Sequence, residues 1–175
     1  MAKADSTTDS SHKDFFPVAD YLQSEISYVD STPLAILRYN IQDKHKDSGF
    51  IQQDEFNRLA AAFLQTDLDH DSMEKKFTET SFFDKTSGYI GFTYTASSTM
   101  LPLQRVDVLA LPVNGVSKVK SVYMEKIFKA GDTAVTQKMY WQTRHNFMII
   151  TSRTLPGKPP VVGQTKVVWD TDTEE

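Results

Sequence analysis

The chain has 175 residues, a net charge of −4 and no cysteine. A chain of this length fits one domain, because chains usually divide only beyond about 250–300 residues. The lack of cysteine excludes disulfides, thiol nucleophiles and iron–sulfur clusters. Nucleic acid is not expected as a partner, since proteins that bind it usually carry a basic face or stripe, and here the lysines and arginines are scattered.

The two ends of the chain are polar. Near the start, the run ADSTTDSSHK has almost no apolar side chains to offset the entropy cost of ordering it. We therefore expect a disordered leader or tether over residues 1–13, a single domain over residues 14–170 and a frayed acidic tail over residues 171–175. No apolar run approaches the roughly 18–20 residues of a transmembrane helix, and no apolar signal-peptide segment follows Met1.

Helical spacing of apolar residues predicts three helices in the first half of the chain. The first covers Asp14–Asp30, where apolar residues recur at positions i, i+3, i+4 and i+7. The second begins near Asp54 and has an apolar stripe that includes Phe56 and Phe63. A third, short helix is expected at Ser72–Phe77.

Strands are predicted on both sides of the last two helices. A first strand is expected at Leu34–Ile41, followed by a polar loop at Gln42–Gly49. From about Thr80 the spacing becomes alternating, which is typical of strands with one buried face. Phe147–Thr154 starts apolar on both faces and should be a central strand. The later strands are expected at Ile90–Thr95, Arg105–Leu111, Lys118–Lys129, Thr133–Thr143, Phe147–Thr154 and Gln164–Asp170.

These elements together predict an α+β fold. The strands follow one another too closely for crossover helices, so the sheet should be antiparallel. Helices and strands are largely segregated along the chain. We expect two to three N-terminal helices packed on one face of a curved antiparallel β-meander of about six to seven strands.

One cluster of acidic residues invites a metal-site hypothesis. Asp67, Asp69, His70 and Asp71 offer carboxylates and an imidazole at close spacing. As a calcium loop the cluster fails, because Ser72 stands where glycine is required and Thr78 where a bidentate glutamate is required. We therefore predict that Asp69 or Asp71 caps the short helix, and we predict no metal or cofactor site.

Catalytic motifs are missing from the sequence. No serine lies in a G-x-S-x-G elbow, and neither a G-x-G-x-x-G nor a P-loop is present. The sequence therefore leans against an enzyme and predicts no catalytic residue. Paired carboxylates of a glycoside hydrolase need no local motif, so a hydrolase remains an alternative. The carboxylates available for that role are Glu79, Asp84, Asp107 and Glu125.

A surface-binding hypothesis centres on Tyr140. Neighbouring strand residues point to opposite faces, so a buried Trp141 places Tyr140 outside, together with Lys138 and Gln142. An exposed aromatic ring beside polar groups can stack on a sugar or contact a protein partner.

The order of segments resembles that of an uncharacterised family of Bacteroidetes-type envelope lipoproteins. The segments are FFPVADYLQSEISYVDSTPLAI, SGFIQQDEF, RLAAAFL, LPLQRVDVL, VKSVYMEKI, KMYWQT, FMIIT and TKVVWD, which cover nearly the whole chain after the leader. The resemblance brings no assigned activity and no catalytic residue.

The resemblance implies an exported domain in the periplasm or at the outer membrane, attached only through an N-terminal lipid anchor. The cysteine that would carry such a lipid is not in this sequence. The expected function is a non-catalytic binding or structural domain with an unknown protein or glycan partner at the envelope. An envelope-polymer hydrolase and a carrier of a small ligand inside the concave sheet are the alternatives.

Overall fold

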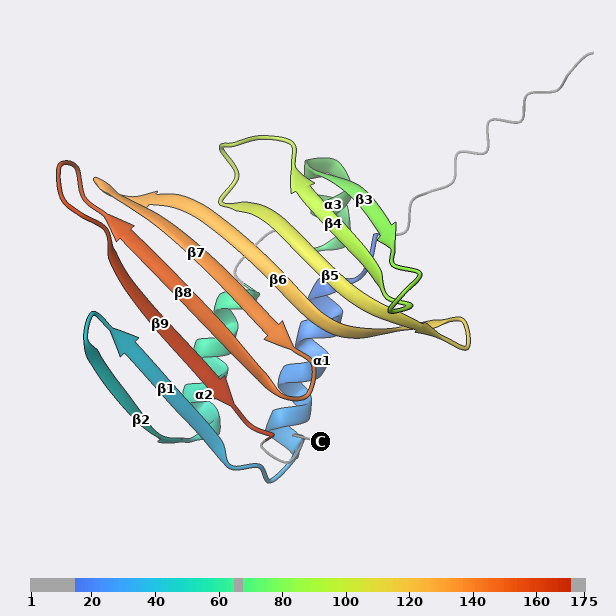
Figure 1. The fold of residues 1–175 in the computed structure, drawn as a ribbon, viewed down its shortest axis with the longest axis horizontal. Coiled ribbons are helices and arrows are strands. Elements are labelled where there is room, and N and C mark those ends of the chain that lie inside the picture. The colour runs from blue at the N-terminus through green and yellow to red at the C-terminus, as the bar shows by residue number, and fades with distance from the viewer. Residues whose placement is uncertain (1–14, 65–67, 171–175) are drawn as a thin grey trace, which may run out of the picture.

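The computed structural model describes residues 15–64 and 68–170, and within these ranges it contains three α-helices and nine strands (Figure 1). The helices are α1 (Val18–Ser31), α2 (Gln53–Ala60), which continues into the 3₁₀ helix η1 (Ala61–Phe63), and α3 (His70–Lys76). The strands are β1 (Ile36–Gln42), β2 (His45–Ile51), β3 (Phe77–Phe83), β4 (Ile90–Ala96), β5 (Leu103–Val113), β6 (Val116–Ala130), β7 (Thr133–Gln142), β8 (Asn146–Thr154) and β9 (Val161–Val168). The leader predicted at residues 1–13 and the tail predicted at residues 171–175 lie outside the described residues.

All the described strands belong to one antiparallel sheet with the order β2-β1-β9-β8-β7-β6-β5-β4-β3. Strands β3 to β9 form a meander in which each strand pairs with the next along the chain. The β1–β2 hairpin then joins the far side of β9. The α+β class and the antiparallel sheet are confirmed, and β8 has the interior position expected for a strand with apolar residues on both faces.

Two details of the predicted fold are wrong. The described sheet has nine strands rather than six or seven, and the helices are not all N-terminal, because the β1–β2 hairpin precedes α2 and α3. The missed strands are β2, which overlaps the segment expected to be a polar loop, and β3. Both lie at sheet edges and are mostly exposed. A strand exposed on both faces has no alternation of apolar and polar residues for sequence reading to detect.

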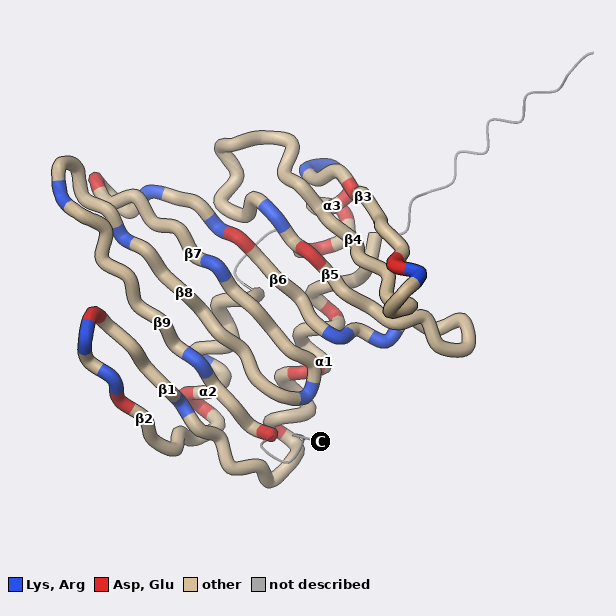
Figure 2. Tube along the Cα trace, in the orientation of Figure 1, with Lys and Arg blue, Asp and Glu red and all other residues tan. Residues whose placement is uncertain are grey.

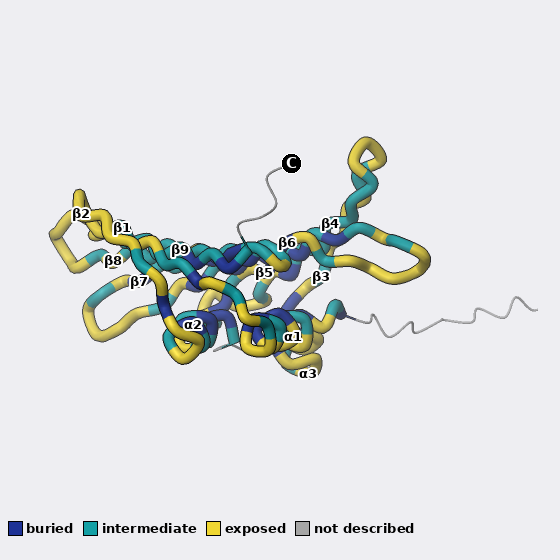
Figure 3. The backbone as a smooth tube through the Cα atoms, turned by 90° about the horizontal axis from the view of Figure 1, so that it is seen from below, coloured by how far each residue is buried: buried dark blue, intermediate teal, exposed yellow. Residues whose placement is uncertain are grey.

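The three helices lie on one side of the sheet and leave its other face open (Figure 3). Between the layers, α2 and η1 pack two phenylalanines against aromatic residues of the sheet. The ring of Phe63 meets Trp141 edge-on with centroids 5.1 Å apart, and Phe56 meets Trp169 edge-on at 5.4 Å. Trp141 also stacks on Phe147 at 5.2 Å. All five rings are at most 2% exposed, so this cluster forms the centre of the core.

Helix α1 is fastened to the turn between β7 and β8. The buried carboxylate of Glu25 accepts the backbone N–H of Arg144 at 2.8 Å and forms an ion pair with its guanidinium at 3.2 Å. The guanidinium of Arg144 also lies over the ring of Tyr28 at 3.6 Å. One turn earlier on the helix, the hydroxyl of Tyr21 hydrogen-bonds to Thr143. This helix begins at Val18, after Pro17, and Asp14, its expected start, lies outside the described residues.

Candidate functional site

A polar cleft with a volume of about 620 Å³ lies on the helix side of the sheet. It forms where the sheet extends beyond the helices. Along β8, Phe147 lies under the aromatic core, whereas Thr151 and Arg153, on the same face of the strand, line the cleft. The end of α2 reaches the cleft only through Leu59.

Strand register shows how the floor of the cleft is built. One row crosses the sheet from Asp47 through Asn40 and Thr165 to Ile149. The next row runs from His45 through Gln42 and Gly163 to Thr151. Because the residues of a row are directly opposite one another on neighbouring strands, their side chains share one face. The cleft is therefore a surface of four rigid strands, β2, β1, β9 and β8.

Gly163 leaves the middle of this floor open. A Cβ atom built on Gly163 would have the carbonyl oxygen of Ile41 as its nearest neighbour, at 3.9 Å, which is an ordinary van der Waals contact. Its φ angle is not in the left-handed region. The backbone does not require glycine at this position, and the missing side chain gives room to a ligand.

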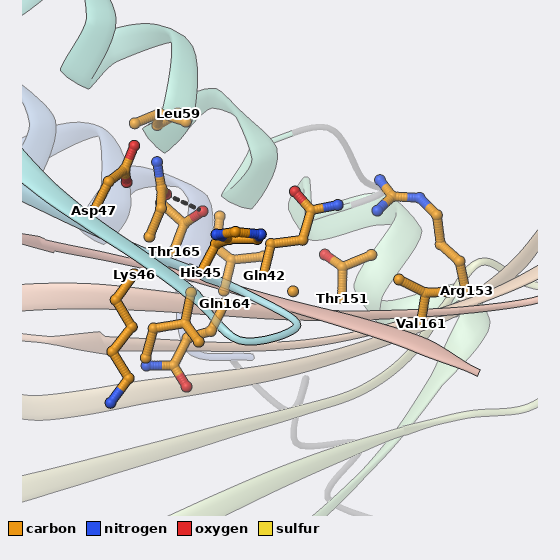
Figure 4. Close-up of a pocket in the computed structure, with 14 residues that line it drawn as sticks. Gln42, His45, Lys46, Asp47, Leu59, Thr151, Arg153, Val161, Gln164 and Thr165 are labelled. Atoms are coloured by element: carbon orange, nitrogen blue, oxygen red, sulfur yellow. Dashed lines mark hydrogen bonds between the residues drawn. The ribbon is translucent and has the colours of Figure 1, made fainter. Parts of the chain in front are cut away.

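The polar side chains of the cleft fall into two groups. Thr165 donates a hydrogen bond to Asn40 at 2.9 Å (Figure 4), and Gln137 donates to Thr151 at 3.3 Å. In contrast, the side chains of His45, Asp47 and Arg153 form no hydrogen bond and no ion pair with any described residue. Arg153 and Asp47 lie at opposite ends of the cleft, with His45 between them (Figure 4).

This arrangement suits a small charged ligand. An arginine guanidinium binds carboxylate and phosphate groups through paired, charge-assisted hydrogen bonds. Asp47 accepts hydrogen bonds from hydroxyl or ammonium groups at the other end. The cleft volume lies within the roughly 300–1,000 Å³ of typical small-molecule sites, and Leu59, Ile149 and Val161 add apolar contact.

Two contacts hold α2 and η1 beside the cleft. Arg38 on β1 forms an ion pair with Glu55 on α2. Lys126 on β6 is only 5% exposed, and its ammonium donates to the carbonyl oxygen of Ala62 at 2.5 Å. Burial lowers the pKa of Lys126. This lysine satisfies a carbonyl group at the C-terminal end of the helical segment, where the helix dipole favours a cation.

The residues considered as metal ligands divide into a helix cap and an exposed group. Asp69 is the N-cap of α3 and accepts the backbone N–H of Ser72 at 2.9 Å, which confirms the capping prediction and lowers the pKa of its carboxyl group. His70 and Asp71 are exposed, and the imidazole lies 3.9 Å from the carboxylates of both Asp71 and Glu74. Asp67 lies outside the described residues.

The four carboxylates considered for hydrolysis are spread over the sheet. Asp84 closes the β3–β4 turn through hydrogen bonds from Thr86 and Ser87, and Glu79 lies opposite Tyr94. Asp107 and Glu125 share the open face, where Asp107 accepts two hydrogen bonds from Arg105 and Glu125 accepts one from Tyr123. None of the four lines the cleft, whose described lining has Asp47 as its one carboxylate.

The surface trio lies where the alternation of β7 predicts. Trp141 is fully buried. Tyr140, Lys138 and Gln142 therefore point to the open face, on the middle strand of the described sheet. Whether they bind a partner stays a prediction.

Sequence reading missed the residues of the cleft. His45 and Asp47 fall in the segment predicted as a loop, and Asn40 belongs to the more polar side of β1. The sequence pattern that indicates the cleft is a series of polar residues at alternate positions near the ends of β1, β8 and β9. These positions continue the core-facing side of each strand but carry asparagine, threonine, arginine and glycine.

Comparisons with known proteins do not assign this site. No protein-family model, no curated protein and no solved structure matches the chain. Among the described residues, no helix is both long and apolar enough to cross a membrane.

Proposed function

We propose that the protein is a non-catalytic binding domain that holds a small anionic molecule in the cleft. The observation that carries this proposal is the position of Arg153. Its guanidinium has no ion-pair partner among the described residues, and it borders a cavity of about 620 Å³. A ligand carboxylate supplies the missing counter-charge, and Gly163 leaves room for the body of the ligand.

The cleft fits binding better than hydrolysis. Acid–base hydrolysis of a glycosidic bond usually employs two carboxyl groups that face each other across the bond, and Asp47 is the one carboxylate in the described lining. The strands that form the floor are held by continuous ladders of hydrogen bonds, so the cleft is preformed. A preformed site binds without the entropy cost of ordering loops.

The test is a titration of the isotope-labelled protein with succinate, citrate and glutamate, followed by NMR. We expect amide shifts confined to residues 40–47, 151–153 and 161–165. The shifts should be lost in Arg153→Gln and in Gly163→Leu, which fills the floor. Arg58→Gln removes an exposed arginine on α2 and should respond like the wild type. The same shifts in Arg153→Gln as in the wild type would disprove the role of the guanidinium.

We also propose that the domain is exported and tethered to a membrane by lipid, as the resemblance to envelope lipoproteins implies. The arrangement of the fold is compatible with a tether. The described chain begins at Phe15, whose ring lies 5.5 Å from that of Tyr94 on β4. The cleft lies on β2, β1, β9 and β8, toward the opposite edge of the sheet. The native gene checks the location: a signal sequence that ends in a small residue and cysteine upstream of residue 4 supports it, and a gene without one refutes it.

A further inference from the structure

We propose that the open face of the sheet, opposite the cleft, binds an acidic polysaccharide, meaning a linear sugar polymer that carries carboxylate groups. This site lies on the other face of the sheet from the cleft, and Lys46 borders both. It rests on the strand register of the open face, on the charges found there and on the distribution of exposed apolar side chains.

A row of three tyrosines, one lysine and one methionine crosses the open face. Strand pairing places Tyr39, Lys166, Met148, Tyr140 and Tyr123 directly opposite one another on β1, β9, β8, β7 and β6. Neighbouring strands lie about 4.8 Å apart, so Tyr39 and Tyr140 are separated by roughly 14 Å. Tyrosine rings provide a flat apolar surface and a polar hydroxyl, and both suit the alternately apolar and hydroxylated surface of a sugar chain.

Three lysines lie on this face, and one of them, Lys138, is directly opposite Glu125 on β6. Lys46 and Lys138 lie in the row next to Lys166, and none of the three has an ion-pair partner among the described residues. The open-face positions of β2, β1, β9, β8 and β7 include no aspartate or glutamate. Figure 2 marks acidic positions on β5, β6 and β2, and the one on β2, Asp47, belongs to the cleft side. On β5 and β6, Asp107 and Glu125 accept hydrogen bonds from Arg105 and Tyr123.

The spacing of the lysines favours a polymer. Lys46 on β2, Lys166 on β9 and Lys138 on β7 are each two strands apart, which is roughly 10 Å measured across the sheet. A linear polyanion that runs across the strands can meet all three ammonium groups in turn and place sugar rings on Tyr39 and Tyr140. A single small anion can reach only one of the lysines.

Other classes of partner fit this face less well. Protein interfaces usually have an apolar centre and a polar rim. Here the most exposed apolar side chains of the open face lie at its margins, with Phe50 and Phe82 on the two edge strands and Ile127 and Val162 toward the hairpin ends. Single-stranded DNA and anionic lipid vesicles are polyanionic as well, so the test below includes them as alternatives.

The experiment is affinity electrophoresis of the full chain in gels that contain polygalacturonate, with neutral dextran as the reference polymer. We expect polygalacturonate to retard the wild type and dextran to leave it unchanged. The double variant Lys138→Gln, Lys166→Gln should bind about thirtyfold more weakly, since each lysine near a polyanionic surface contributes roughly a factor of five. Tyr140→Ala should bind at least about fivefold more weakly through lost stacking.

Control variants separate this site from charge alone and from the cleft. Lys85→Gln removes one positive charge from the β3–β4 turn and should bind like the wild type, and so should Gly163→Leu. A wild type that polygalacturonate does not retard would overturn the proposal. It would equally be overturned if single-stranded DNA or anionic lipid vesicles bound as well as polygalacturonate and Tyr140→Ala changed nothing.

Discussion

The carboxylate of Glu25, in the middle of α1, holds the backbone N–H and the guanidinium of Arg144 at the same time. Arg144 has a left-handed backbone conformation with φ of 61°, which is uncommon for a residue other than glycine. One buried carboxylate thus joins the helix layer to the sheet and helps to stabilise a strained turn.

We expect Glu25→Gln to lower the free energy of unfolding by about 1–3 kcal/mol. The amide keeps the shape of the side chain but loses the charge that a buried ion pair requires. Urea denaturation measures the change. Glu74→Gln, at an exposed position on α3, is the matched control and should change stability by less than about 0.5 kcal/mol. Equal effects of the two substitutions would contradict the importance of the buried pair.

The aromatic core should be sensitive at Phe63. We expect Phe63→Ala to cost about 3–5 kcal/mol, because the change removes a fully buried ring and leaves a cavity beside Trp141 and Phe147. The quantity to measure is the urea midpoint together with the slope of the transition. Phe50→Ala, on the exposed edge strand, should be nearly neutral. A loss below about 1 kcal/mol at Phe63 would mean that η1 does not pack as described.

Stability should fall in alkaline solution because two tyrosines are buried. Burial raises the pKa of Tyr21 and of Tyr94 above the usual value. The folded state then retains protons that the unfolded state releases, so the stabilisation is complete below about pH 10 and is lost as the pH rises from there toward the folded-state pKa. Each tyrosine contributes a slope of up to about 1.4 kcal/mol per pH unit.

Phenylalanine variants test this pH dependence. Denaturation of Tyr94→Phe at pH 9 to 11 should show a shallower loss of stability than the wild type, whatever the stability at pH 7. A slope unchanged in both Tyr94→Phe and Tyr21→Phe would contradict the raised pKa values. Tyr39→Phe, on the open face, is the control.

Lys126 should have the opposite effect on the pH dependence of stability, which it should raise with increasing pH. Its pKa is lowered by burial, so between the folded-state pKa and the unfolded value of about 10.4 the unfolded chain binds a proton that the folded chain lacks. The penalty for burying the charge is present below the folded-state pKa and disappears as the pH rises. The wild type should therefore gain stability relative to Lys126→Met as the pH rises toward the unfolded value. A difference that is constant with pH would show that the buried lysine titrates normally.

Gly163→Leu should separate binding from stability. The new side chain enters the cleft without a backbone clash, so we expect the free energy of unfolding to change by no more than about 1 kcal/mol. Binding of small carboxylates should be abolished. The same substitution at Gly115, in the β5–β6 turn, should destabilise the fold, because φ is 76° there. Retained binding in Gly163→Leu would place the ligand elsewhere.

The elements that could be predicted from the sequence are those with one face buried in the core and the other exposed to solvent. Predicted and observed bounds of β7 and β8 agree to within one residue, because both strands pack one face against the helices and turns separate them clearly. The edge strands β2 and β3 lack such a contrast and were missed. The apolar faces of the helices predict where they occur in the chain. The pairing of β2 with β1 depends on contacts between strands, and no local sequence pattern reveals it.

The cleft was harder to predict than the core for a similar reason. Alternation along β1 separates Leu37, Tyr39 and Ile41 from Arg38 and Asn40 but does not show which side faces the helices. Pairing with β9 decides this, because Arg38 lies opposite Val167 and Asn40 opposite Thr165. The polar row beside the core therefore depends on the pairing of β1 with β9, two strands from opposite ends of the chain, and could not be predicted from either strand alone.

The pairing of β1 with β9 also sets the order of events during biosynthesis. A ribosome releases the β1–β2 hairpin early, yet its neighbour β9 leaves last, and an isolated two-stranded hairpin is at best marginally stable in water. The floor of the cleft is consequently the final part of the molecule to become whole. A premature stop before residue 161 leaves the β3–β8 meander contiguous but yields a product in which the floor of the cleft cannot form.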